Sequence, residues 1–177
     1  MSTRQIEATL FGRETDFEYS ETWVGYSLLA LRLVMGWTLF YGGIDKVLAS
    51  DWSAQGYLMG AATREGTLFA GFWETMATDY IGIVDPLNMW GLTLVGLALM
   101  VGAFVRWSAF WGAVMMLFYY FSSYPLSHSL LIDDHIVYAV LLFGLGAFGA
   151  GRILGVDEYL EKTAVVENNP WLRYFLG

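Results

Sequence analysis

The sequence predicts an all-α integral membrane protein, a four-helix bundle with both termini in the cytoplasm. Its composition is 56% hydrophobic with a mean hydropathy of +0.49, above the roughly 45–50% apolar share of soluble chains. The apolar residues gather in four blocks without the alternation of polar and apolar positions that strands show. Because only helices and closed barrels satisfy the backbone within lipid, these blocks are predicted to be transmembrane helices.

The four predicted spans follow one another along the chain and cover residues 23–44, 87–105, 107–121 and 136–154. With a rise of about 1.5 Å per residue, the first is long enough to cross a hydrocarbon core of roughly 30 Å. Only Arg106 separates the second span from the third. Two helices joined by so short a turn are predicted to be antiparallel neighbours.

The basic residues predict the orientation in the cell membrane. The segments predicted on the side of the two termini carry six basic residues, Arg4, Arg13, Arg106, Arg152, Lys162 and Arg173. The segments on the opposite side of the membrane carry two, Lys46 and Arg64. Lys and Arg concentrate in cytoplasmic segments, so both termini are predicted to be cytoplasmic. The chain then divides into a cytoplasmic arm (residues 1–22), a transmembrane domain (23–155) with an external loop (51–86), and a cytoplasmic tail (156–177).

The external loop contains an apolar stripe at helical spacing, formed by Leu68, Phe72 and Met76. Thr67 directly precedes this stripe and is predicted to cap the N-terminus of the helix. We expect an amphipathic helix here that lies on the membrane or closes over the bundle as a lid.

Charge and cysteine content exclude several classes of protein. Nine Lys and Arg residues stand against seventeen Asp and Glu residues, which gives a net charge of −8 and disfavours nucleic acid as a partner. An acidic, lysine-poor surface is typical of a halophilic archaeon, where carboxylates keep the surface hydrated in high salt. The chain has no cysteine, so disulfides, thiolate nucleophiles and Cys-ligated iron–sulfur clusters are excluded.

Arg32 is the charged residue within the first predicted span. An arginine near the middle of a membrane helix costs about 2.5–3.5 kcal/mol even on insertion scales, and no carboxylate in the later spans is available to pair with it. Two interpretations stay open. The guanidinium bonds to Glu18, Glu21, lipid headgroups or helix carbonyls, or it holds the polar head of a ligand or a partner subunit.

Further polar residues gather where the first span ends and the fourth begins. With Arg32 they form the candidate site for a quinone or a lipid, which comprises Arg32, Tyr41, Asp45, Lys46, Asp134, His135 and Tyr138. Lys46 is expected to pair with Asp133 or Asp134 across the external mouth of the bundle. Aromatic walls with a few convergent polar groups suit the ring and carbonyls of a quinone. The alternative is an ion-pair network that seals the bundle.

No metal site and no catalytic residue is predicted. His128 and His135 lie seven residues apart, but Pro125 precedes them, so a shared helical face is not assured. The same short segment would have to supply both axial ligands of a haem, which is poor geometry.

Two segments give the sequence a family resemblance. The run ALRLVMGWTLFYGGIDKVL (residues 30–48) resembles the first-helix signature of the DoxX family, and WGLTLVGLALMVGAFVRWSA (residues 90–109) resembles its second helix and the basic turn that follows. The stretch HSLLIDDHIVYAVLL is similar to the haloarchaeal branch. The matching positions are Arg32, Gly36, Gly43, Lys46 and Arg106, none of which is an established catalytic residue.

The resemblance implies a small four-helix membrane protein associated with respiratory or redox complexes. Some relatives form the membrane subunit of a thiosulfate:quinone oxidoreductase. Since this chain has no cysteine, Rossmann fingerprint or P-loop, it is not expected to transfer electrons alone or to hold a covalent cofactor. The first hypothesis is therefore a non-catalytic subunit or accessory factor of a quinone-linked electron-transport complex in the respiratory chain. The alternatives are the membrane subunit of a thiosulfate:quinone oxidoreductase and a pathway for small solutes or protons.

Overall fold

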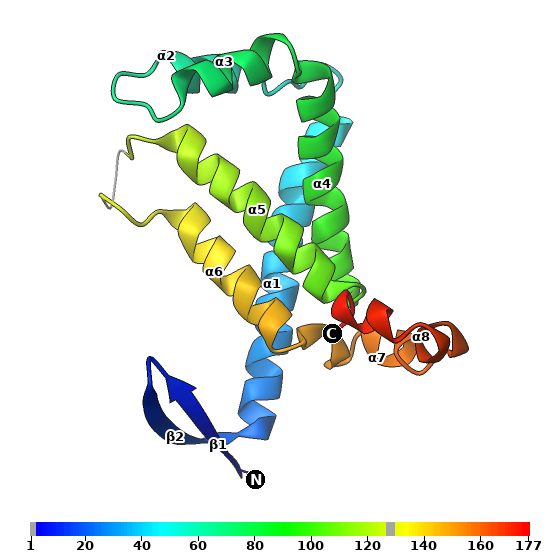
Figure 1. Ribbon diagram of the computed structural model, residues 1–177. Coiled ribbons are helices and arrows are strands. Elements are labelled where there is room, and N and C mark those ends of the chain that lie inside the picture. Colours follow the sequence, from blue (N-terminus) through cyan, green and yellow to red (C-terminus); the bar gives the residue numbers. More distant parts are fainter. Residues whose placement is uncertain (1–2, 127–129) are drawn as a thin grey trace.

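The computed structural model describes residues 3–126 and 130–177, and this part of the chain is mostly helical (Figure 1). Its main elements are a hairpin of β1 (Thr3–Leu10) and β2 (Arg13–Ser20) and the long helices α1 (Glu21–Leu48), α4 (Ile81–Val101), α5 (Val105–Ser123) and α6 (Asp134–Ala147). The connection from α1 to α4 holds α2 (Gln55–Thr63) and α3 (Ala70–Thr78). The chain ends with η1 (Ala150–Arg152), α7 (Val156–Leu160), α8 (Ala164–Asn168) and η2 (Pro170–Tyr174).

Among the described helices, α1 and α4 are long and apolar enough to cross a membrane, and α6 is a shorter apolar helix. Glycines in left-handed conformations set two of the helix ends. Gly102, with φ of +71°, ends α4, and Gly149, with φ of +65°, lies just after α6. The prediction of one continuous helix over residues 136–154 was therefore wrong, because the chain turns after Ala147 and continues as the short η1.

The N-terminal arm forms a hairpin, which the sequence analysis did not anticipate. Its two-residue turn consists of Phe11 and Gly12, both with positive φ (52° and 77°), as the tightest hairpins require. The strand signal is short, since Ile6, Ala8 and Leu10 give only three alternating apolar positions.

Residues 51–86, the predicted external loop, contain two helices, α2 and α3, where one was predicted. The predicted cap is absent, because the Thr67 hydroxyl bonds to the Leu68 carbonyl and the left-handed Phe69 precedes α3. Trp73 turns inward, and its indole Nε1 donates to the Leu68 carbonyl at 2.7 Å. The buried residues Ala54, Leu58, Ala61, Trp73 and Ala77 give α2 and α3 a small core of their own. This pair of helices lies across the end of α4, at the top of Figure 1.

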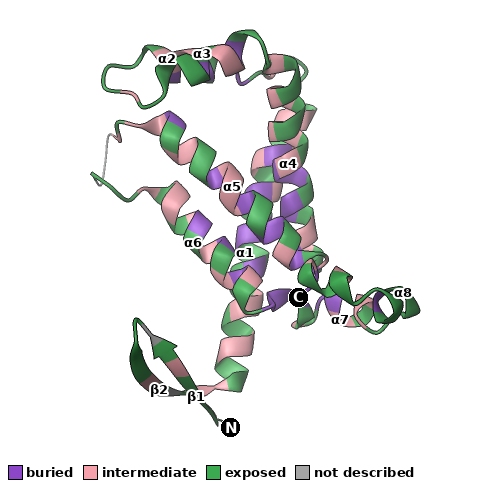
Figure 2. Cartoon of the chain, viewed as in Figure 1, coloured by how far each residue is buried: buried purple, intermediate pink, exposed green. Residues whose placement is uncertain are grey.

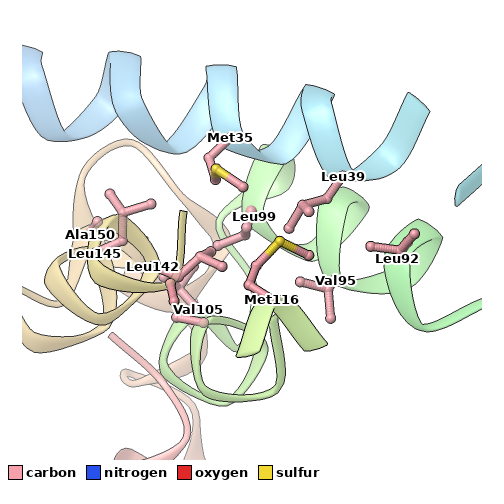
Figure 3. Close-up of a cluster of buried hydrophobic side chains, with 12 residues drawn as sticks. Met35, Leu39, Leu92, Val95, Leu99, Val105, Met116, Leu142, Leu145 and Ala150 are labelled. Atoms are coloured by element: carbon pink, nitrogen blue, oxygen red, sulfur yellow. The ribbon is translucent and has the colours of Figure 1, made fainter. Parts of the chain in front are cut away.

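The main core lies where the four long helices meet. In Figure 3, Met35 and Leu39 of α1 face Leu99 of α4, with side chains of α5, α6 and η1 beside them. Glycines allow α1 and α4 to approach closely: a Cβ on Gly36 would lie 2.8 Å from Met100 Cγ and 2.9 Å from its backbone nitrogen. Small residues at a helix crossing are the usual device for tight packing in lipid.

The outward faces of the long helices are exposed and apolar (Figure 2). Large exposed side chains include Trp37 and Tyr41 on α1, Leu87 and Leu94 on α4, Phe110 and Phe118 on α5, and Val140 and Phe143 on α6. Soluble monomers rarely expose apolar patches of this extent. Such faces are typical of helices that contact lipid.

Candidate functional site

An apolar cavity of about 800 Å³ lies between α4 and α5, with α2 and α3 over one end. Its walls are mainly aliphatic and aromatic, including Leu58, Phe72, Trp73, Met76, Leu87, Leu94, Leu97, Val101, Trp107, Trp111, Met115 and Phe118. Leu94 and Phe118 are 57% and 51% exposed, so the cavity is open along the side where α4 and α5 face outward. A concave apolar site of this size is typical of small-molecule pockets.

Most polar groups of the cavity lie toward α2 and α3, whereas Ser108 lines it near the start of α5. Asn88 Nδ2 donates to the Tyr119 hydroxyl at 2.5 Å, whereas Asn88 Oδ1 is buried and has no partner within the described residues. At the end of α5, the Tyr57 hydroxyl bonds to the hydroxyls of Ser122 and Ser123 at 3.0 and 2.9 Å. None of the lining residues in the described part of the chain carries a charge. Apart from Ser108, the cavity therefore offers its hydrogen bonds at one end and apolar contacts elsewhere.

Arg32 lies outside this cavity, and its side chain is only 1% exposed. Its Nη1 donates to the carbonyls of Ala150 and Ile153 at 2.5 and 3.0 Å, and its Nη2 to that of Leu154 at 3.5 Å. Nε is buried without a partner among the described residues. This geometry corresponds to the alternative in which the guanidinium bonds to backbone carbonyls.

Asp157 is the carboxylate that acts electrostatically on Arg32, and it lies in the segment predicted to be the cytoplasmic tail. It is fully buried. Its side chain accepts hydrogen bonds from the backbone N–H groups of Phe104, Val105 and Gly177 at 2.7, 3.0 and 3.0 Å. Burial raises the pKa of the Asp157 carboxyl, and these three bonds oppose the rise only in part. Asp157 therefore stabilises the fold chiefly by satisfying three backbone donors at the start of α5 and at Gly177.

Two glycines make room for the guanidinium. A Cβ on Gly102 or on Gly155 would lie 2.8 Å from Arg32 Nη1, and the Asp157 N–H donates to the Gly102 carbonyl at 2.8 Å. Since Gly102 ends α4, Arg32 lies level with the turn between α4 and α5. At this end α1, which begins at Glu21, extends past the other helices (Figure 1). We call Arg32, Gly102, Gly155 and Asp157 the Arg32 cluster.

The residues predicted for the external mouth do not form one cluster. Lys46 donates to the Gly42 carbonyl at 2.6 Å and lies 5.5 Å from the centre of the Trp52 ring. Within the described residues it forms neither of the predicted ion pairs, with Asp133 or with Asp134. The start of α6 lies apart from the end of α1, because α5 and α6 lean away from α1 and α4 (Figure 1).

The other candidate residues are divided between these two helix ends. Tyr41 and Asp45 are exposed on α1, and Asp134 is exposed at the start of α6. Tyr138 packs against the main core. His135 bonds through Nδ1 to Asp133 Oδ2 at 2.6 Å and lies beside the Tyr119 ring. The structure therefore does not bring the seven predicted residues into one site.

Across residues 3–126 and 130–177, no group of three His, Cys, Asp or Glu side chains is placed to hold a metal ion. His128, which the sequence analysis considered together with His135, lies outside the described residues.

Long helices with exposed apolar faces and a cavity that opens between two of them define a helical membrane protein. The DoxX family model matches residues 27–125, more than half of the chain, and the protein therefore belongs to the DoxX family. No curated protein and no solved structure matches. The family prediction made from the first-helix signature is confirmed, and the matched range runs from α1 through α5, including Arg32 and both walls of the cavity.

Proposed function

We propose that the protein is an integral membrane subunit or accessory factor of a quinone-linked redox complex, in which it binds a quinone or a lipid. The observation that carries the proposal is the uncharged cavity between α4 and α5, which opens on the apolar outer face of a membrane protein. A ligand reaching it would come from the membrane phase, where quinones and lipids are found.

In this proposal α1, α4, α5 and α6 cross the membrane as a four-helix bundle, and both termini are cytoplasmic. The distribution of Lys and Arg supports this orientation. The Arg32 cluster then lies at the cytoplasmic end, and α2 and α3 lie at the external end above the cavity.

The proposed role is auxiliary because the chain lacks cysteine and the sequence fingerprints of nucleotide cofactors. A partner subunit would supply the electrons, and this protein would supply a binding site and a membrane anchor. Among the described residues, the apolar walls of the cavity offer no continuous line of polar groups, so we do not favour the solute or proton pathway.

Isolation from native membranes in a mild detergent tests the proposal. We expect redox subunits and a quinone or lipid to copurify with the chain, as identified by mass spectrometry. Thiosulfate-dependent quinone reduction by the chain plus one partner would favour the thiosulfate:quinone oxidoreductase subunit over the accessory role. A folded chain recovered without redox subunits, quinone or bound lipid would contradict the proposal.

A further inference from the structure

We infer that the cavity between α4 and α5 binds the reduced, hydroxyl-bearing form of a neutral quinol-type amphiphile, with a ring hydroxyl at Asn88 and Tyr119. This inference rests on the proposed function in that the ligand arrives from the membrane. It adds the redox form of the ligand and the residues that hold it.

The lining excludes a charged headgroup. The polar side chains in the described walls of the cavity are neutral: Tyr57, Asn88, Ser108, Tyr119 and Ser122. A phosphate or carboxylate placed among them would lose its hydration and find no cation, which is strongly unfavourable at an apolar site. A neutral ring avoids this cost and stacks against the surrounding aromatic side chains.

The hydrogen bonds at the polar end select between the oxidised and reduced forms of such a ring. Asn88 Nδ2 already donates to the Tyr119 hydroxyl, and Asn88 Oδ1 has no donor within the described residues. A ligand hydroxyl can donate to Asn88 Oδ1 and accept from the Tyr119 O–H. A quinone carbonyl can only accept, so it leaves the Asn88 oxygen buried without a donor, which weakens its binding.

The remainder of the cavity suits an apolar tail. From Asn88 to Val101 the cavity follows α4, a rise of roughly 20 Å in a helix. The exposed side chains of Leu94 and Phe118 border its open side, through which a longer tail reaches the lipid. The polar head then lies toward α2 and α3, and the tail points toward the turn between α4 and α5.

The test uses the full chain in phosphatidylcholine nanodiscs and two probes, decyl-benzohydroquinone and decyl-benzoquinone, with binding measured anaerobically by equilibrium dialysis. We expect saturable binding of the reduced probe, about tenfold tighter than that of the oxidised probe. Asn88→Leu should weaken binding of the reduced probe about tenfold and leave the oxidised probe almost unchanged.

Two further variants separate the site from general effects. Thr38→Val removes an exposed polar group from α1, outside the cavity, and should leave both affinities unchanged. Gly91→Phe should abolish binding of both probes, because Gly91 lines the cavity and only the flexible end of Met115 stands near its missing Cβ. Size-exclusion chromatography and the unfolding midpoint check that each variant is folded.

Several outcomes would overturn the inference. If the native chain bound the two probes with equal affinity, the preference for the reduced form would be contradicted. If a folded Asn88→Leu variant bound the reduced probe as tightly as the native chain does, the role of Asn88 in that preference would be contradicted. Competition by oleate as strong as that by the reduced probe would contradict the neutral headgroup. Absence of saturable binding in the folded chain would reject this site, whereas redox subunits copurifying from native membranes would still support the proposed function.

Discussion

Replacing Asp157 with alanine is expected to lower the free energy of unfolding by about 3–5 kcal/mol. The change leaves the backbone N–H groups of Phe104, Val105 and Gly177 without their acceptor. It also removes the carboxylate that acts on the buried Arg32 guanidinium. Reversible unfolding in detergent, followed by tryptophan fluorescence, measures the loss.

Glu158 provides the matched control for this variant. It is the next residue along α7, but its carboxylate pairs with Lys162 at 2.9 Å on an exposed surface. Exposed pairs of this kind contribute little to stability, so Glu158→Ala should be nearly neutral. Equal stability of the two alanine variants would contradict the role assigned to Asp157.

The conservative variant Asp157→Asn tests how much of the stability depends on the hydrogen bonds that the carboxylate accepts. Asp157→Asn keeps one acceptor oxygen, so we expect a stability between those of the native chain and Asp157→Ala. If Asp157→Ala is not recovered in folded form, the asparagine variant still gives a measurable result. An asparagine variant as stable as the native chain would show that one acceptor oxygen is sufficient.

The contrast between Arg32 and Asp157 shows what sequence patterns reveal about the Arg32 cluster. Arg32 was identified because a cation within a long apolar run is costly and therefore conspicuous. Asp157 was missed because it stands beside Glu158 and Glu161 in a segment that looks like a solvated acidic tail. Its burial depends on the turn between α4 and α5, which lies more than fifty residues away along the chain.

The boundaries of the helices were predicted with unequal accuracy. The first span was predicted within a few residues, since apolar residues predominate along α1. The second begins at Ile81, six residues earlier than predicted, because Asp85 and Pro86 interrupt the apolar pattern although a helix continues through them. Local composition thus located the centres of the helices better than their ends.

The cavity was not predicted from sequence because its walls come from several separate elements and are almost entirely apolar. Apolar residues at helical spacing give the same signal whether they fill a core or line a cavity. Asn88 was the available clue, as an amide near the start of a predicted span. Its significance depends on its contact with Tyr119, which only the packing of α4 against α5 creates.

Two adjacent glycines of α1 are expected to respond in opposite ways to the same substitution. A Cβ on Gly43 would lie 2.5 Å from Thr93 Oγ1 and 2.9 Å from the backbone carbonyl carbon of Leu92. Because α4 cannot move aside without opening the main core, Gly43→Ala should lower the free energy of unfolding by about 1–3 kcal/mol. The same unfolding measurement in detergent tests this value.

Gly42 has nothing within 4 Å of its missing Cβ. Alanine is favoured over glycine in helices by about 1 kcal/mol, so Gly42→Ala should be neutral or slightly stabilising. Gly96→Ala tests the same contact from α4, since its Cβ would lie 2.6 Å from the Gly36 carbonyl oxygen, and it should be destabilising like Gly43→Ala. Equal effects at positions 42 and 43 would mean that helix propensity, rather than the close approach of α1 to α4, explains the glycines of the family signature.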